Sequence, residues 1–500
     1  KSICTASTLT FSADEAGRYF ILISATNAGG TTEKEIRIDV FQLDIPTISI
    51  ADADKGFKVL QGSELTITPI VDSFLETSYS WQINGEDISN ELTCTLPTIE
   101  LGEYQVRFAT HNEDGDDEVT FKVEVCSPDQ VDFNWTFLQT EYNMSAGRTI
   151  RIKPVDVNNA LDAVYTWTVD NEQVQSGEND TYLFTSEQQG EHTVKVEMKN
   201  SYILATQTLK VNVCPPAGTY QRKISATSSA SMNKVYEYLP APGQFINENH
   251  TTTTMAEACT YAEERINQTA YVSLGGFGGY IIVGFDHSIV NDGDYNIAVT
   301  GNAFDGSSEP GIVWVMQDEN GDGLPNDTWY ELRGSEYGKA ETWQDYAVTY
   351  HKPTGIQLPT PWTDNHGQSG SIDYLGAFHR QDYYYPAWVK EKQYTLRGTR
   401  LKERNYDQSG NGTYWVNDSY EWGYADNFSA IDRLTDDDNY NAGPSDNHFK
   451  ISHAVTFDGK DANLKYVDFI KVQVGVNSKS GWLGEISTEV FGIKDFNMLK

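Results

Sequence analysis

Positive charge is the first thing that this 500-residue sequence lacks. It has 36 lysine and arginine residues against 72 aspartate and glutamate residues, which gives a formal net charge of −36 and a pI near 4.5. Such a chain repels phosphate backbones and anionic lipid surfaces, so binding to nucleic acid or to a membrane surface is disfavoured. The acidic residues are spread along the chain rather than massed in one tail. This pattern indicates a solvated exterior with affinity for cations.

Cysteine and long apolar runs are also scarce. Five cysteines are too few for a disulfide framework, and neither a CxxC pair nor a Cys/His zinc spacing occurs. We expect the cysteines to be small buried residues; Cys126 and Cys214 stand where predicted domains end. No run of eighteen apolar residues occurs, so the sequence predicts no membrane span. The HExxH, GxSxG and GxxxxGK[ST] motifs are absent too, which argues against the chemistries that they support.

What the sequence does contain is a repeated hairpin pattern, with a period of roughly 85–88 residues. Each copy begins at a glycine and continues as an alternating strand, a polar turn and a second alternating strand, over residues 17–40, 102–125 and 190–213. Two copies are preceded by a Trp-containing strand, at 79–83 and 165–169. A tryptophan in a central strand is the usual core of an immunoglobulin-like sandwich.

These segments resemble PKD-type immunoglobulin-like domains, on the Trp strand and on the G-x-Y/H-x-V-x-V strand before an Asn-containing turn. Residues 1–42 hold only the last strands of one such domain, and we expect the chain to have lost or to lack the preceding part. Residues 43–126 and 127–214 are predicted to be two complete domains. The resemblance implies spacers that hold a terminal module away from a cell.

Residues 215–500 are predicted to form one larger domain, which begins after Cys214-Pro215-Pro216. One helix is expected over 254–267, with Thr254 as N-cap and Glu257 at the capping-box position. Its residues at helical spacing are Ala256, Cys259, Ala262, Glu263 and Ile266. The rest reads as many short strands joined by turns, which favours a single β-sandwich of jelly-roll type. The predicted class is therefore all-β: tandem immunoglobulin-like sandwiches, then a larger jelly roll with one short helix.

The run over 274–285, and the later segments 309–315 and 467–472, resemble galactose-binding-like jelly rolls of bacterial surface proteins. Tandem PKD-like domains followed by such a module are similar to surface lipoproteins of Gram-negative gut bacteria. The resemblance implies an extracellular location on the bacterial cell surface, with outer-membrane anchoring through a segment that precedes Lys1. Its relatives capture glycans or assist corrinoid (vitamin B12) uptake, so it also implies an outer-membrane transporter complex as partner.

The stretch 318–327 has the spacing of a calcium loop. Side-chain oxygens at alternate positions followed by a glycine let a short segment wrap one hard cation. The predicted ligands are Asp318, Asn320, Asp322, the carbonyl of Leu324, and Asp327 or Glu331 to close the site. An EF-hand proper is disfavoured because Trp329 stands where its final glutamate belongs; a solvated Asx/Gly turn is the alternative. A second acidic run, 436–439, is expected to be a solvated loop.

Aromatic residues cluster within 362–424, among Asp, Asn, Gln and Gly. Consecutive tyrosines such as 383–385 cannot all face one core from a strand, and exposed aromatic clusters usually mark a binding surface. The predicted ligand-binding residues are Tyr384, Trp388, Trp415, Trp422 and Tyr424, with Arg380 and Asp426 as polar partners.

These observations predict a non-enzymatic, cell-surface ligand-capture protein with a structural calcium ion. A glycan or a corrinoid would bind to the C-terminal jelly roll, and the immunoglobulin-like domains would be spacers. Two alternatives stay open: a structural adhesin that binds another protein, and a glycoside hydrolase on the same scaffold. The hydrolase would need a carboxylate pair with separated pKa values. Candidate carboxylates near aromatics are Glu309, Asp373, Asp382, Glu421 and Asp426.

Overall fold

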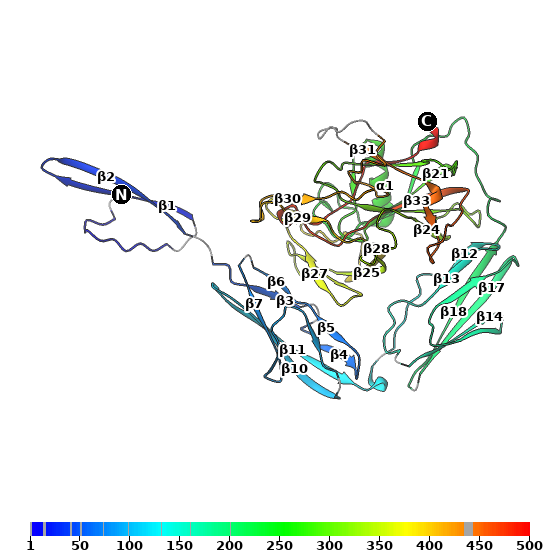
Figure 1. Cartoon of the computed structure of the whole chain (residues 1–500), viewed down its shortest axis with the longest axis horizontal. Coiled ribbons are helices and arrows are strands. Elements are labelled where there is room, and N and C mark those ends of the chain that lie inside the picture. Colours follow the sequence, from blue (N-terminus) through cyan, green and yellow to red (C-terminus); the bar gives the residue numbers. More distant parts are fainter. Residues whose placement is uncertain are drawn as a thin grey trace. The chain divides into compact units, whose positions relative to one another are not determined.

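The computed structural model of the chain describes residues 3–13, 17–40, 43–50, 53–73, 75–98, 100–131, 133–160, 162–200, 202–434 and 444–500. It contains two compact units (Figure 1). The first comprises residues 1–57, 69–94 and 103–123, and the second comprises 58–68, 95–102 and 124–500. Strands dominate the described residues, with one α-helix, and the predicted all-β class is confirmed. The acidic run 436–439 lies outside the described residues.

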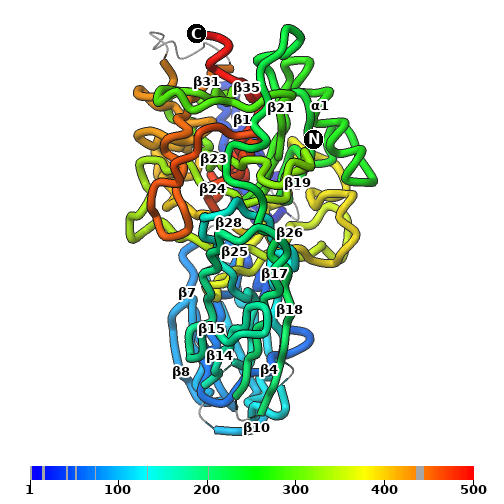
Figure 2. The backbone as a smooth tube through the Cα atoms, turned by 90° about the vertical axis from the view of Figure 1, so that its right-hand side faces the viewer, coloured from blue at the N-terminus to red at the C-terminus, as the bar shows by residue number. Residues whose placement is uncertain are grey.

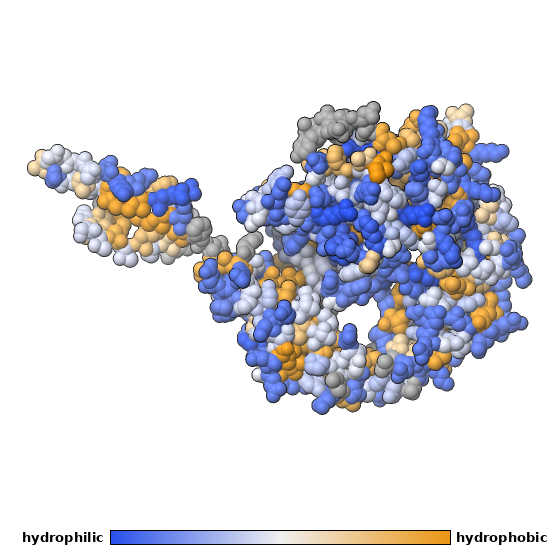
Figure 3. Space-filling model, in the orientation of Figure 1, coloured by the Kyte–Doolittle hydropathy of each residue, from blue (hydrophilic) through white to orange (hydrophobic). Residues whose placement is uncertain are grey.

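The first hairpin consists of β1 (Gly17–Asn27) and β2 (Gly30–Val40), as the repeat predicted. The strands pair antiparallel from Gly17 opposite Val40 to Asn27 opposite Gly30. Large apolar side chains on both strands are exposed, and Figure 3 shows apolar atoms gathered on this hairpin. They are Phe20, Leu22, Ile23 and Ile36.

The second immunoglobulin-like segment forms a five-stranded sheet in the order β4-β11-β10-β7-β8. Two further pairs, β3-β6 and β5-β9, complete it. Trp81 lies in β7 and is fully buried, as predicted for the Trp strand, and its indole N–H donates to the carbonyl of Glu91. The strand bounds are β3 (Thr47–Ser49), β4 (Phe57–Leu60), β5 (Leu65–Ile67), β6 (Ile70–Asp72), β7 (Ser78–Ile83), β8 (Glu86–Ser89), β9 (Cys94–Leu96), β10 (Gly102–Asn112) and β11 (Gly115–Cys126).

The third segment repeats this plan with the sheet order β12-β18-β17-β14-β15, and β13-β16 pair separately. Trp167 in β14 is fully buried, and its ring stacks on the ring of Tyr182. The first strand, β12, runs parallel to the last, β18. The bounds are β12 (Glu141–Ser145), β13 (Thr149–Ile152), β14 (Val164–Val169), β15 (Glu172–Gly177), β16 (Tyr182–Thr185), β17 (Gly190–Lys199) and β18 (Leu204–Cys214).

The C-terminal domain is built on a six-stranded sheet in the order β19-β21-β33-β23-β24-β32. A three-stranded sheet, β31-β22-β35, and the pair β20-β34 contribute to the same apolar core. The bounds are β19 (Lys234–Leu239), β20 (Val272–Ser273), β21 (Tyr280–Val290), β22 (Ile297–Gly301), β23 (Gly311–Met316), β24 (Trp329–Leu332), β31 (Ser445–Phe449), β32 (Ala454–Val455), β33 (Tyr466–Val474), β34 (Glu489–Val490) and β35 (Gly492–Asp495). Buried side chains from these strands, including Val283, Val299 and Ile470, meet in this core.

A second, smaller core of the same domain lies under the sheet β27-β26-β25-β28. It gathers Tyr346 and Tyr350 from the sheet with Phe277 and Tyr385 from loops. The remaining bounds are β25 (Trp343–His351), β26 (Thr360–Asp364), β27 (Ser369–Ile372), β28 (Gln393–Arg400), β29 (Asn405–Asp407) and β30 (Trp415–Asn417). This arrangement is a larger β-sandwich with an added sheet.

The helix α1 (Met255–Asn267) begins where the sequence predicted. Thr254 is its N-cap, because the Thr254 hydroxyl accepts from the Glu257 backbone N–H. α1 packs against β19 and lies along the outside of the domain (Figure 2). Its buried residues are Ala258, Ala262 and Ile266, one helical turn apart, whereas Ala256, which the sequence assigned to this face, is exposed.

The structure also bears on the cysteines and on the predicted absence of a membrane span. All five cysteines are free, and Cys94, Cys126 and Cys214 are buried, whereas Cys4 is exposed. No helix in the described ranges is long and apolar enough to cross a membrane.

Candidate functional site

The predicted calcium loop connects β23 to β24. Its backbone wraps around the Asp318 carboxylate, which accepts the Gly321 N–H at 2.7 Å and the Gly323 N–H at 3.0 Å. Both glycines have positive φ, +79° and +73°, a backbone conformation that is unfavourable for residues other than glycine. The side-chain oxygen Oδ1 of Asn320 accepts the Asp322 N–H in the next turn. The loop thus consists of tight Asx/Gly turns, a geometry that is compatible both with the predicted calcium loop and with its alternative, a solvated turn.

The two ends of this loop are buried. Asp318 is 4% exposed and Asp327 is 3% exposed. One oxygen of Asp327 accepts the Glu319 N–H at 3.0 Å, whereas Oδ1 has no hydrogen-bond partner among the described residues. Burial, together with the nearby carboxylates of Glu319, Asp318 and Asp322, raises the pKa of Asp327 to about 8. The ionised form of Asp327 therefore lacks a compensating charge in its surroundings.

The oxygen donors of the loop fit calcium chemically, because calcium takes carboxylate, amide and carbonyl oxygens. The three carboxylates Asp318, Asp322 and Asp327 do not, however, form a group whose oxygens all lie within 4.8 Å of one another. A calcium ion here would depend also on Asn320 and on backbone carbonyls. The Leu324 side chain is 47% exposed, as a residue that contributes only its carbonyl can be.

The loop has partners that the sequence did not predict, among them Arg148 of the third immunoglobulin-like segment, which lies within the same compact unit. Arg148 Nε lies 3.0 Å from Glu319 Oε1, and the Ser145 N–H donates to the other oxygen of Glu319. The Nε–H does not point at Oε1, so this contact is an ion pair rather than a hydrogen bond. The Arg148 guanidinium donates instead to Gln317 Oε1, at 2.8 Å.

Three of the residues predicted to contact a ligand are buried. Tyr384 is 1% exposed, Tyr424 is 2% exposed and Asp426 is 1% exposed. Tyr384 belongs to the second core and donates its hydroxyl to the His379 carbonyl, while the Tyr424 hydroxyl accepts the Glu336 N–H. The exposed surface predicted from the sequence cannot include these side chains. Residues 383–385 lie in a loop that the core encloses, so the alternation rule for strands did not apply to them.

The four other predicted ligand-binding residues each have a different set of neighbours. Arg380 is exposed and donates to the Gly376 carbonyl. Trp415 in β30 packs against Gly481, Trp422 packs against the His453 ring at 5.2 Å, and Trp388 lines a cavity. Of the seven predicted residues, Trp388 lines the cavity described next.

That cavity lies beside α1 and is lined mainly by aromatic and polar side chains. Its volume is about 20 Å³, which holds about one water-sized group. The lining residues are Tyr238, Phe245, Ile246, Asn247, Asn249, His250, Thr252, Tyr261, Arg265, Tyr271, Ser273 and Trp388. Two buried hydrogen-bonding atoms in this set, Trp388 Nε1 and Thr252 Oγ1, have no partner in the described part of the chain.

An open groove of about 460 Å³ adjoins the cavity along α1. His250, Tyr261 and Arg265 line both spaces, and the His250 ring stacks on Tyr261 with centroids 5.3 Å apart and planes at 15°. Arg265 is fixed by its Nε–H, which donates to the Tyr271 carbonyl, and by the Tyr271 ring beneath it. The sequence analysis identified this helix but assigned it no functional residues.

A cluster of three carboxylates is the second feature that sequence reasoning missed. Glu309, Asp426 and Glu489 each place a ligand oxygen within 4.8 Å of the others, and the described residues contain no other such group of His, Cys, Asp or Glu. Burial raises the pKa of all three, that of Asp426 to about 8. These residues are far apart in the sequence, so no local motif could have signalled the cluster.

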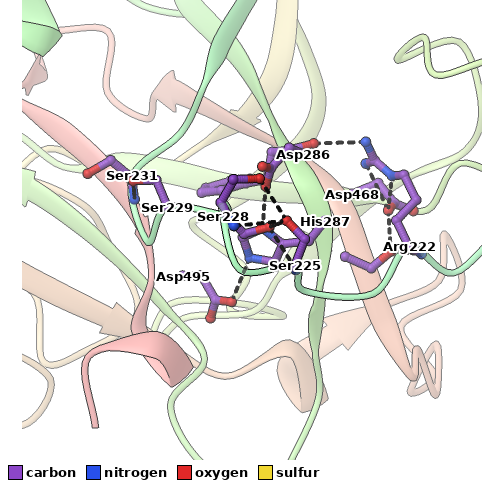
Figure 4. A network of polar contacts seen from close by, with 12 residues as sticks. Arg222, Ser225, Ser228, Ser229, Ser231, Asp286, His287, Asp468 and Asp495 are labelled. Carbon is purple, nitrogen blue, oxygen red and sulfur yellow. Dashed lines mark hydrogen bonds and ion pairs between the residues drawn. The ribbon is translucent and has the colours of Figure 1, made fainter.

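A polar network beside the six-stranded sheet also includes a buried histidine (Figure 4). His287 is fully buried, with Nδ1 2.7 Å from Asp286 and Nε2 2.9 Å from Asp495. Asp468 accepts from the Ser288 hydroxyl and from Arg222. Because both His287 nitrogens face carboxylates, neither can act as a base toward a serine hydroxyl. The network ties the chain at Arg222 to β21 and β33 and is structural.

The comparisons with known proteins agree with the immunoglobulin-like part of this architecture. The family model described as PKD-like domain matches residues 45–112 and 117–200. The chain therefore contains tandem immunoglobulin-like domains, which in PKD-like form are typical of extracellular proteins. The first match lies within the predicted segment 43–126, and the second begins ten residues before the predicted segment 127–214; the domain boundaries stay predictions. No curated protein matches the chain.

Solved structures with similar parts include the fibronectin(III)-like modules of Clostridium thermocellum CbhA, at 15% identity and a TM-score of 0.19. They cover 36% of this chain and 100% of theirs. A chimeric titin Z1Z2 carrying a decorin peptide has 19% identity and a TM-score of 0.21, and covers 35% and 98%. The Ig1-2 module of the Drosophila receptor protein tyrosine phosphatase DLAR has 12% identity and a TM-score of 0.17, and covers 34% and 97%.

Proposed function

We propose that the C-terminal domain captures a glycan, without catalysing a reaction, at the cavity and groove beside α1. The supporting observation is the pair of buried hydrogen-bonding atoms, Trp388 Nε1 and Thr252 Oγ1, that lack partners at an aromatic cavity. Native proteins satisfy nearly all such atoms, so an unpaired pair at one cavity favours a bound water or ligand group there. The cavity admits one small group, and the groove has the volume of a small-molecule site.

Aromatic ring faces in the cavity and groove suit the apolar face of a sugar ring, and the polar side chains beside them suit its hydroxyl groups. The Tyr261 ring, stacked by His250, lies at the border of cavity and groove, and Arg265 supplies further N–H donors beside it. A corrinoid is the alternative ligand class. Its macrocycle is larger than a sugar ring and would have to lie mostly outside the cavity. The immunoglobulin-like domains are spacers in this proposal, on a bacterial surface protein with outer-membrane anchoring and a transporter complex as partner.

Glu257, an acidic residue that lines the groove, supports the proposal that this site is not catalytic. Hydrogen bonds from Thr253 lower the pKa of Glu257, whereas the general acid of a glycosidase needs a raised pKa. We further propose that the loop 318–327 binds calcium, since the uncompensated charge at Asp327 would be offset by a divalent cation. Calcium would stiffen this loop and so stabilise the native domain.

The test is a calorimetric titration of the whole chain with a glycan panel and with cobalamin, in calcium and in EDTA. Thr252→Val keeps the side-chain shape without the hydroxyl, and Trp388→Phe keeps a ring without the N–H. Each should weaken binding roughly 10-fold, the cost of one lost buried hydrogen bond. Trp482→Phe is the matched control, because Trp482 is 50% exposed and does not line the cavity.

The outcomes separate the alternatives. Saturable binding that both cavity variants weaken, with the control unchanged, supports the proposal and identifies the ligand class. Binding that neither variant affects places the site elsewhere and refutes the assignment to the cavity. Hydrolysis of a glycan during the titration would establish the glycoside hydrolase instead. Absence of binding to every compound would favour the adhesin.

A further inference from the structure

The carboxylate cluster joins three distant parts of the C-terminal domain. Glu309 lies just before β23, Asp426 lies in the segment after Tyr424, and Glu489 begins β34. The three chain segments are also tied by backbone contacts, since the Glu309 N–H donates to the Asp426 carbonyl at 2.9 Å. The Thr488 hydroxyl donates to the Glu309 carbonyl. The cluster is therefore held by the fold rather than by flexible side chains.

Backbone donors favour the ionised form of Asp426, against the burial that raises its pKa. Its Oδ1 accepts the N–H groups of Asn302 and Ala303 at 2.8 and 2.9 Å, and its Oδ2 accepts the Glu489 N–H at 2.9 Å. Three N–H donors on one carboxyl group favour the carboxylate. Oδ2 keeps a further lone pair, so Asp426 can bind a cation through Oδ2 without losing these hydrogen bonds.

Glu489 is less well satisfied. It is 4% exposed, and its Oε1 is buried without a hydrogen-bond partner in the described structure. Glu485 approaches the same region, is also 4% exposed, and has its Oε2 unpaired. None of these glutamates, nor Asp426, has an ion pair to a lysine, arginine or histidine of the described ranges. In their ionised forms these groups would be buried without a counter-ion, at a cost of roughly several kcal/mol per group, and a bound cation would remove that cost.

We propose that Glu309, Asp426 and Glu489 bind a calcium ion at the junction of β34 with the segments before β23 and after Tyr424. All available donors are carboxylate oxygens, which select a hard cation. Calcium–oxygen distances of about 2.3–2.6 Å put opposite ligands up to roughly 4.6–5.2 Å apart, and the cluster oxygens lie within 4.8 Å of one another. The unpaired Glu489 Oε1 is the atom that most needs this partner.

The ion would hold together three segments that are far apart in the sequence. This site is separate from the loop 318–327 and from the cavity beside α1, and it does not depend on the proposed ligand capture. Its chemical class is a structural oxygen-ligated calcium site rather than a catalytic one, since Asp426 and Glu489 are buried and Glu309 is partly buried.

The test counts calcium ions on the whole chain by native mass spectrometry and by calorimetric titration with calcium chloride after EDTA treatment. Glu489→Gln and Glu309→Gln keep the side-chain size and remove the charge. Each should bind one ion fewer than the wild type. Glu341→Gln is the matched control and should bind as many ions as the wild type, because Glu341 pairs with Lys402 on the surface, with 60% of its side chain exposed, outside both proposed calcium sites. Without calcium, Glu489→Gln should melt at or above the wild-type temperature, because a buried charge has been removed.

A second measurement does not depend on the variants. Hydrogen exchange of the wild-type chain should slow on calcium addition at the amides of Asn302, Ala303 and Glu489, which bond to Asp426. An equal number of ions in wild type and both glutamine variants would overturn the proposal. So would a wild type that binds no calcium, or amides at these positions that calcium leaves unchanged.

Discussion

Replacing Arg148 with methionine removes the counter-ion of a buried glutamate. Glu319 has 2% of its side chain exposed, and Arg148 has 17%. The change leaves the Glu319 carboxylate with the Ser145 N–H as its remaining donor and removes the hydrogen bond to Gln317. Methionine keeps the length of the aliphatic stem, so packing along it is largely preserved.

Breaking one partner of a buried ion pair costs about 3–5 kcal/mol. We expect the lower end, about 3 kcal/mol, because Arg148 is partly exposed and its Nε–H does not point at Glu319. Glu319→Gln in the same background should restore much of this loss, since the buried charge is then gone. The double-mutant cycle should give a coupling of about 2 kcal/mol between the two positions.

The assay is differential scanning calorimetry of the whole chain, with the third immunoglobulin-like domain and the C-terminal domain followed as separate transitions. Burial raises the pKa of Glu319, and Arg148 opposes this shift. A raised folded pKa means stability that is present below the unfolded pKa and lost as pH rises. The penalty of Arg148→Met should therefore be larger at pH 8 than at pH 4, where Glu319 is protonated.

Arg151→Met is the matched control, because Arg151 pairs with Asp345 at 32% and 46% exposure. Exposed pairs contribute about 0–1 kcal/mol, so this control should barely shift the transitions. A coupling between positions 148 and 319 under about 0.5 kcal/mol, the range of independent sites, would refute the ion-pair reasoning.

Three further outcomes follow from packing and burial. Trp167→Ala should cost about 3–5 kcal/mol and lower the melting temperature of its domain, whereas the 50% exposed Trp482 should tolerate alanine with a far smaller shift. Glu331→Gln should raise the melting temperature at pH 8 and leave it unchanged near pH 4. Burial raises the pKa of Glu331 to about 7. The stability that the protonated form of Glu331 contributes is therefore lost as pH rises through that value, by up to roughly 3 kcal/mol. Equal effects at both pH values would contradict this. Gly279→Ala should prevent folding of the C-terminal domain, seen by circular dichroism, because its Cβ would lie 1.8 Å from the Leu274 carbonyl oxygen.

The sequence predicted the features that local patterns control. The Trp strands, the three hairpins and the cap at Thr254 depend on residues a few positions apart, and each stands as predicted. The order of the C-terminal sheets depends on pairs such as Ile281 with Val472, which no local period reveals. Sequence patterns can therefore identify strands there without identifying their neighbours.

The site was predicted less well for the same physical reason. The turn at 318–327 was recognisable because its residues are adjacent. Burial of Tyr384 and Tyr424 follows from loops that fold into cores, where period-two alternation has no meaning. Asp426 was singled out as a rim residue because of its neighbours in sequence, yet Glu309 and Glu489 surround it in space. Only three-dimensional packing could distinguish a rim carboxylate from a cluster carboxylate.

The parallel pairing of β12 with β18 has a mechanical consequence. These strands begin and end the third immunoglobulin-like domain, and they pair from Glu141 with Lys210 to Ser145 with Cys214. Tension on the two ends of the domain acts along both strands in opposite directions, so these hydrogen bonds are loaded together in shear. A hairpin pulled at its open end, such as β17-β18, would instead break one bond at a time. Single-molecule pulling should therefore find a high rupture force for this domain, as a tether under flow would require.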